Sequence, residues 1–137
     1  MQDHASPRVT LHVCVTCRRG EETLEPKEGR SGYKMQLALA RAMEAGQAAG
    51  IELVPVECLS GCKRSCTVAL AAPGKWSYVI ADLDPERHAA DILTFAQQYS
   101  AHPDGVPVWR ERPEIVKRSV LARVPPLPSA IEKEEPA

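Results

Sequence analysis

The 137-residue sequence predicts one α/β domain, in which a strand, a helix and a second strand are followed by a hairpin and a further helix. Three observations lead to this fold class. Residues 8–16 alternate apolar and polar side chains, which is the period of a strand with one covered face. Residues 31–49 repeat apolar side chains at helical spacing. Residues 67–83 form two β-rich runs around a Pro-Gly-Lys turn, which is typical of a hairpin.

Local signals predict the remaining elements. The polar, glycine-containing stretch between the first strand and the helix predicts a long loop, and Gly50 is the expected helix stop. Residues 51–58 indicate a second strand. Pro55 favours an edge position for it, because proline cannot donate a ladder hydrogen bond. Asp84 and Pro85 predict the start of the last helix, as its N-cap and its first residue.

The C-terminal segment differs in composition from the rest of the chain. Six of the twelve prolines follow Gly105, which argues against long regular structure there. We therefore expect a disordered N-terminus over residues 1–7, a domain over residues 8–102, an extended basic arm over residues 103–128 with one short helix from Pro113, and a disordered acidic tail over residues 129–137. The arm is expected either to wrap the domain or to dock a partner. The order of elements in the domain, βαβ followed by ββα, is that of a thioredoxin-like fold.

Composition narrows the range of functions. The formal net charge of −1 offers no field that would attract nucleic acid. No apolar run approaches the roughly 20 residues that span a bilayer, and the N-terminus lacks the apolar core of a signal peptide. We therefore expect a cytoplasmic protein without nucleic-acid or membrane partners. No phosphate-binding glycine loop, nucleophile elbow or close carboxylate pair is recognisable, so we do not expect an enzyme.

The five cysteines fall into two groups. Cys14 and Cys17 follow the first strand, whereas Cys58, Cys62 and Cys66 follow the second and recur every four residues. Because parallel strands of a βαβ unit end at the same edge of the sheet, we expect both groups to meet there. Four thiolates suit zinc or an iron–sulfur cluster, and the loose spacing of the second group favours a cluster. Four of the five cysteines are expected to be ligands, with Cys66 or Cys17 as the spare.

Basic residues flank both cysteine loops. Arg18 and Arg19 follow the first pair, and Lys63 and Arg64 follow Cys62. Such a rim would stabilise thiolates or dock an acidic redox partner, and the alternative is that these are two solvated basic loops.

Two other functions remain open. One is a zinc-binding or other metal-binding module, such as a metallochaperone. The other is a thiol-disulfide oxidoreductase, which the Cys-x-x-Cys pair Cys14 and Cys17 would suit if it lay at a helix N-terminus. Because thirteen residues separate Cys17 from the helix, we do not expect the helix dipole to reach the pair.

Two families share motifs with this chain. The segments "VECLSGC" and "GKWSYVIADL" resemble those of the thioredoxin-like 2Fe-2S ferredoxins, over roughly residues 8–101. More closely, "HVCVTC", "CLSGCKRSCTVAL" and "VWRERPE" resemble a bacterial family of unknown function whose members are labelled predicted metal-binding proteins, over nearly the full length.

These resemblances imply a small one-electron carrier with a 2Fe-2S cluster and a redox protein partner. Cys14, Cys58 and Cys62 match the ligands of the ferredoxin family, and Cys17 matches less closely. Cys66 has a counterpart in the second family alone. The second family also implies an association with cobalamin-related genes. Since ferredoxins of this fold are often dimers, a homodimer is one of the states to test.

Overall fold

The computed structural model describes residues 9–18, 26–46, 50–60 and 62–128, so the predictions for residues 1–7 and 129–137 lie outside the described residues. The strands are β1 (Val9–Cys14), β2 (Ile51–Val56), β3 (Val68–Ala71), β4 (Ser77–Ile80) and β5 (Val120–Val124). The helices are α1 (Ser31–Ala45), α2 (Ala89–Ala101) and α3 (Glu114–Ser119). Short 3-10 helices are η2 (Lys27–Gly29), η3 (Cys62–Arg64) and η4 (Trp109–Glu111).

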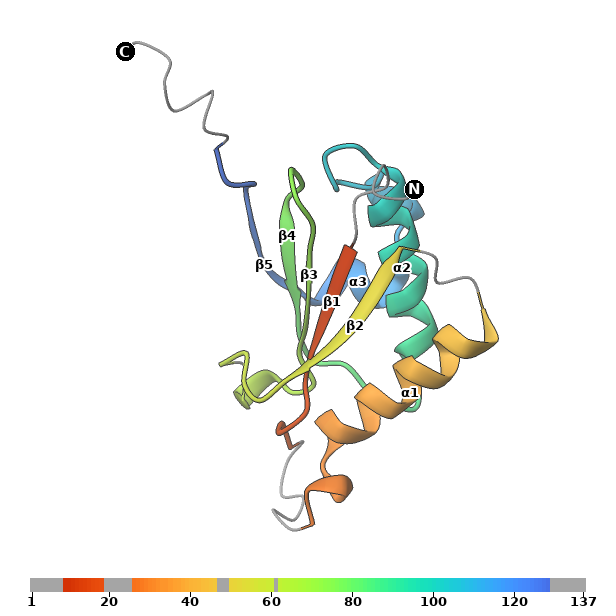
Figure 1. The fold of residues 1–137 in the computed structure, drawn as a ribbon, viewed down its shortest axis with the longest axis vertical. Coiled ribbons are helices and arrows are strands. Elements are labelled where there is room, and N and C mark those ends of the chain that lie inside the picture. The colour runs from red at the N-terminus through yellow and green to blue at the C-terminus, as the bar shows by residue number, and fades with distance from the viewer. Residues whose placement is uncertain (1–8, 19–25, 47–49, 61, 129–137) are drawn as a thin grey trace, which may run out of the picture.

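The strands form one mixed sheet in the order β2-β1-β3-β4-β5 (Figure 1). Strands β1 and β2 are parallel, and the other neighbouring strands are antiparallel. The sheet has β2 at one edge, as the proline at position 55 predicts. The predicted βαβ unit and the predicted hairpin of β3 and β4 are both confirmed, and the architecture is α/β.

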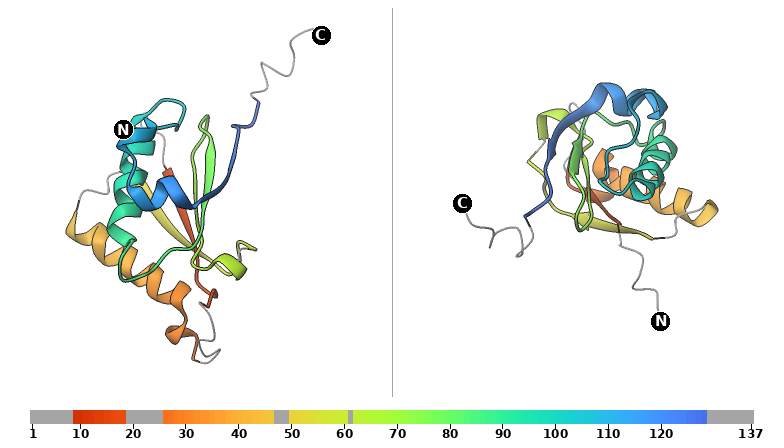
Figure 2. Two further views of the ribbon diagram at one scale, coloured as in Figure 1. Left: turned by 180° about the vertical axis from the view of Figure 1, so that it is seen from behind. Right: turned by 90° about the horizontal axis from the view of Figure 1, so that it is seen from above.

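Helices α1 and α2 pack together on one face of the sheet (Figure 2). The alternation in β1 decides which side chains they cover. Val9, Leu11 and Val13 are fully buried, whereas Thr10 and His12 face the other side and are partly exposed. Helices α1, α2 and α3 complete this core with buried apolar side chains, which are Met35, Leu39, Ile92, Leu93, Phe95, Ala96, Tyr99, Ile115 and Val116.

Both long helices differ from their predicted bounds. Helix α1 ends at Ala45 rather than reaching Gly50, which instead lies in a turn with φ +80° before β2. Helix α2 begins at Ala89 rather than at Pro85. A separate turn precedes it, in which the Asp84 N–H donates to Nδ1 of His88 at 2.8 Å and the Asp84 carboxylate accepts the backbone N–H of residue 86 at 2.8 Å. Asp84 therefore caps a turn instead of the helix.

The segment expected to be an extended arm is largely part of the fold. The predicted short helix from Pro113 is α3, and the residues after it form β5, which extends the sheet beside β4. The prolines lie before and after residues 114–124, and this proline-free stretch is long enough for a helix and an edge strand. Docking of a partner by this segment stays a prediction. Residues 125–128 are exposed.

Within the described ranges, no helix is both long and apolar enough to cross a lipid bilayer.

Candidate functional site

The cysteine loops follow β1 and β2, and both loops lie at the same end of the sheet (Figure 1). Cys14 is the last residue of β1 and pairs in register with Val56, the last residue of β2. Two hydrogen bonds join the loops just beyond the strands. The Val15 N–H donates to the Val56 carbonyl at 2.9 Å, and the Thr16 hydroxyl donates to the Glu57 carbonyl. The predicted meeting of the loops at one sheet edge is confirmed.

Cys14 and Cys17 form a buried pair of thiols. Their sulfurs are 2.8 Å apart, and their exposed fractions are 1% and 3%. The S–H of Cys17 donates to the Cys14 sulfur, and this bond is the main cause that lowers the pKa of Cys14 to about 5, against the opposing effect of burial. Backbone N–H groups of Thr16 and Leu59 also bind the Cys14 sulfur and lower its pKa. The same bond and burial raise the pKa of Cys17. The shared hydrogen bond therefore favours the thiolate form of Cys14 and the thiol form of Cys17.

The first turn of α1 packs against the backbone of this pair. The Gly32 N–H donates to the Cys17 carbonyl at 3.0 Å, and an Arg30 guanidinium nitrogen donates to the Thr16 carbonyl at 3.3 Å. A Cβ atom on Gly32 would overlap the Cys14 carbonyl oxygen and would lie 3.0 Å from the Cys17 nitrogen. The helix N-terminus therefore lies against the backbone of the pair, although thirteen residues separate Cys17 from the helix in the sequence.

The second cysteine group is spread over a longer segment. Cys58 is exposed, and its sulfur accepts the Ser60 N–H at 3.2 Å. Cys66 is fully buried, and its backbone exchanges two hydrogen bonds of 3.1 Å with Leu83. Charge on Cys66 contributes to the raised pKa of Cys17, so the two thiols lie within electrostatic reach of each other. The side chain of Cys62 lies outside the described part of the structure.

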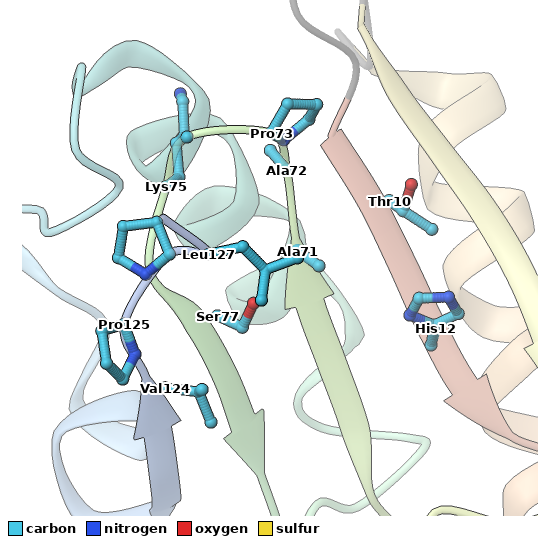
Figure 3. A pocket seen from close by; sticks show the side chains of 12 residues that line it. Thr10, His12, Ala71, Ala72, Pro73, Lys75, Ser77, Val124, Pro125 and Leu127 are labelled. Atoms are coloured by element: carbon cyan, nitrogen blue, oxygen red, sulfur yellow. The ribbon is translucent and has the colours of Figure 1, made fainter. Parts of the chain in front are cut away.

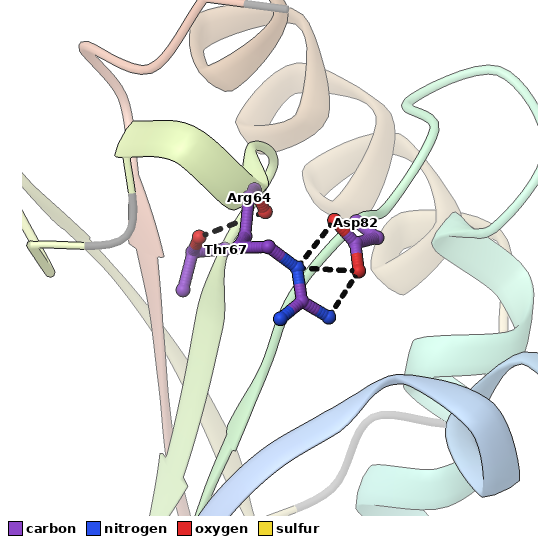
Figure 4. Close-up of polar contacts among 3 residues, drawn as sticks. All are labelled: Arg64, Thr67 and Asp82. Atoms are coloured by element: carbon purple, nitrogen blue, oxygen red, sulfur yellow. Dashed lines mark hydrogen bonds and ion pairs between the residues drawn. The ribbon is translucent and has the colours of Figure 1, made fainter.

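Arg64 in the predicted basic rim is held by a carboxylate. Its Nε donates to Oδ1 and Oδ2 of Asp82 at 3.0 and 2.8 Å, and its carbonyl accepts the Asp82 N–H at 2.7 Å and the Thr67 hydroxyl at 3.4 Å (Figure 4). These bonds fasten η3 to the segment after β4. The sequence did not identify Asp82 as part of the site, because a single aspartate after a strand gives no sign that it pairs with an arginine. Of the other rim residues, Lys63 is exposed, Arg18 is partly exposed, and Arg19 lies outside the described residues.

A groove of about 600 Å³ lies on the helix-free face, at the opposite end of β1 from Cys14. It is lined mainly by small or apolar residues, with His12 on one side and Leu127 on the other (Figure 3). Lys75 also lines it, but its Nζ donates to the carbonyls of Tyr99 and Ser100 at 3.0 and 2.7 Å. The ammonium group of Lys75 therefore caps the end of α2.

The thiol donors fit a metal or cluster in their chemistry. Among the described side chains, no group of three or more His, Cys, Asp or Glu residues is already arranged around a metal position. Two thiolates on one tetrahedral metal would be about 3.8 Å apart, given metal–sulfur bonds of about 2.3 Å. The sulfurs of Cys14 and Cys17 are 2.8 Å apart, and rotation of a side chain would increase this distance to the value that a metal requires.

Solved structures with a similar fold include two of a thioredoxin-like [2Fe-2S] ferredoxin from Aquifex aeolicus. One is 16% identical, with a TM-score of 0.55, and the match covers 85% of this chain and 92% of the ferredoxin. The other, of the wild-type protein, is 16% identical, with a TM-score of 0.52 and coverage of 84% and 97%. At this identity the match shows a thioredoxin-like fold, as the order of elements predicts.

No curated protein matches the chain. The family described as "Protein of unknown function (DUF1636)" matches residues 11–126, which is most of the sequence. This chain therefore belongs to the DUF1636 family.

Proposed function

We propose that this protein binds a metal through its cysteines, and that it is a one-electron carrier with a 2Fe-2S cluster. The observation that carries the proposal is the buried pair Cys14 and Cys17, which lies in direct contact with the loop that begins the second cysteine group. Cys58 and Cys62 of that loop would complete the ligand set. Cys66 would be the spare, because of the cysteines it alone belongs to the apolar core cluster of the described residues.

The chain's own residues would hold and tune this centre. The backbone N–H groups of Thr16 and Leu59 that bind the Cys14 sulfur are of the kind that sets the reduction potential of a thiolate-bound cluster. The Arg64–Asp82 pair would keep the second loop in place. A bound 2Fe-2S cluster would supply transfer of one electron at a time.

The partner of such a carrier would be a redox protein. We propose that it docks near the exposed Lys63, where a positive charge would favour an acidic surface. We propose a carrier without an enzymatic activity of its own. A homodimer, a cytoplasmic location and service to a cobalamin-related pathway stay predictions from the sequence.

The first test is the spectrum of the protein purified without oxygen. Iron, sulfide and zinc are assayed on the same sample, and EPR is recorded after dithionite. A red-brown protein with equal iron and sulfide and a rhombic signal on reduction would support the cluster. A colourless protein with bound zinc would support a zinc-binding module instead of the cluster. A protein that takes up neither iron nor zinc after attempted reconstitution would refute both the cluster and the zinc module.

Substitution of the cysteines tests the ligand set. Cys14→Ser, Cys17→Ser, Cys58→Ser and Cys62→Ser are each expected to lower the bound iron or to change the EPR signal, because an oxygen donor replaces a thiolate. Cys66→Ser is the matched control and is expected to leave the signal unchanged. If Cys66→Ser loses the signal while Cys17→Ser retains it, the fourth ligand is Cys66.

A thiol-disulfide oxidoreductase is a second candidate, and the contact between the Cys14 and Cys17 sulfurs favours it. Reduction of insulin by dithiothreitol, with and without the protein, measures this activity. Acceleration that is lost in Cys14→Ser and in Cys17→Ser would support it. No acceleration by the metal-free protein would exclude it.

A further inference from the structure

A second pocket of about 530 Å³ lies beside β4 and β5, away from the ends of β1 and β2 where the cysteine loops lie. Its lining comes from β4, from β5, and from the segment over residues 106–112 that contains η4. The lining residues are Tyr78, Val106, Pro107, Val108, Trp109, Arg112, Val120 and Arg123. Two of them are arginines and none is acidic, so the pocket carries positive charge.

Arg112 is held in a fixed orientation. Its Nε and one terminal nitrogen donate to the Pro107 carbonyl at 3.1 and 2.8 Å. Its guanidinium lies over the rings of Tyr78, Phe95 and Trp109, at 5.7, 5.6 and 5.4 Å from their centroids. A guanidinium has five N–H donors, so these contacts leave donors of Arg112 available.

Arg123 contributes the second guanidinium, which lies 4.5 Å from the centroid of the Trp76 ring. Within the described ranges, neither Arg112 nor Arg123 forms an ion pair with a carboxylate. Two arginines that line one pocket, with no acidic residue in its lining, favour the binding of an anion.

Tyr78 is an independent sign of a missing hydrogen-bond acceptor. Its ring is fully buried and packs edge-on against Phe95 at 5.3 Å and Tyr99 at 5.9 Å. Its hydroxyl is buried and has no hydrogen-bond partner among the described residues. Buried hydroxyl groups normally have a partner, and a phenol O–H is a good donor to an anion.

We propose that this pocket binds a small organic anion, in which a carboxylate or phosphate group is attached to a flat apolar body. The guanidinium groups of Arg112 and Arg123 would bind the anionic group, because their planar donors match carboxylate and phosphate oxygens. Trp109, which is 57% exposed, offers its ring to the flat body at the side of the pocket. The volume is within the usual range for small-molecule sites, about 300–1,000 Å³. This binding function is independent of the cysteine site.

The test uses the indole N–H signal of Trp109 in ¹H–¹⁵N NMR spectra of the full chain, assigned with Trp109→Phe. Benzoate, phenyl phosphate and uncharged benzamide are titrated separately. Benzoate or phenyl phosphate is expected to shift the signal to saturation at least about tenfold more tightly than benzamide, because charge-assisted hydrogen bonds hold the anion. The tighter of the two anions identifies the carboxylate or the phosphate. Equal binding of benzoate, phenyl phosphate and benzamide, or no saturable shift with either anion, would overturn the proposal.

Three variants locate the site. Arg112→Gln, Arg123→Gln and Tyr78→Phe are each expected to weaken anion binding, whereas Arg110→Gln, an exposed neighbour outside the lining, is the matched control. If Arg112→Gln does not fold, the other two variants test the site. Arg123 lies on an exposed edge strand and Tyr78→Phe removes only one oxygen atom, so both variants are expected to fold. Unchanged affinity in both, or an equal loss in Arg110→Gln, would contradict the assignment.

Discussion

Gly32→Ala tests whether the close contact between α1 and the cysteine pair is required. The added methyl group would overlap the Cys14 carbonyl oxygen and would lie 3.0 Å from the Cys17 nitrogen and 3.1 Å from the Val15 carbonyl carbon. All three neighbours are backbone atoms, so no flexible side chain can move aside. Either the first turn of α1 or the loop from Cys14 to Cys17 must shift.

The expected loss of stability follows from two opposing effects. Overpacking of a close contact costs about 1–3 kcal/mol, and the upper end applies because backbone is displaced. Alanine regains up to about 1 kcal/mol through its higher helix propensity. The net expectation is about 2 kcal/mol less stability, which lowers the urea midpoint by about 1.3 M for a slope of about 1.5 kcal/mol per M. The displaced loop is also expected to bind less metal.

Gly46→Ala is the matched control at the other end of the same helix. Its added Cβ would lie 3.4 Å from the Ala42 carbonyl oxygen, which is close to an ordinary contact, and its φ of −132° suits any residue. Urea unfolding followed by circular dichroism compares the two variants. If Gly32→Ala unfolds at the same urea concentration as Gly46→Ala and retains the same metal content, the inferred contact does not constrain the site.

Two further predictions concern polar groups at the ends of α2. Lys75→Met removes both hydrogen bonds that Nζ makes to carbonyls at the end of the helix. We expect urea unfolding to show that the free energy of unfolding falls by about 2 kcal/mol, because the carbonyl acceptors lose their partner. A decrease smaller than the error of the fit would contradict the capping role. Burial lowers the pKa of His88, and its Nδ1 accepts the Asp84 N–H, which a protonated ring cannot do. The folded state therefore favours the neutral ring, so the stability from His88 is complete above about pH 6.5 and is lost as the pH falls through the lower pKa of the folded state. His88→Asn should reduce the difference between urea midpoints at pH 7.5 and pH 5, and an unchanged difference would refute this role.

Several parts of the fold could be predicted because they depend on short-range patterns. The alternation in β1 identified the buried side chains Val9, Leu11 and Val13, and one proline placed β2 at the sheet edge. The candidate site followed from topology, since cysteines after two parallel strands must end at the same edge. The positions of Cys14 and Cys58 after two parallel strands were therefore enough to predict that they lie in neighbouring loops.

Other parts depended on contacts between distant segments, which no local pattern encodes. Helix α2 follows a turn in which the His88 ring accepts the Asp84 N–H, and β5 pairs with β4 at the edge of the sheet. The proline-rich composition after Gly105 suggested an arm, but burial of Ile115 and its neighbours outweighed that tendency.

The sequence by itself determined the faces of β1, the order of the elements from β1 to α2 and the two cysteine groups, because each depends on the period or spacing of nearby residues. Only the tertiary structure decided that α1 packs against Cys14, that Arg64 is bound to Asp82, and that two arginines share one pocket. The physical reason is that these contacts join segments far apart in the chain, and their geometry is set by packing of the whole core rather than by any local preference.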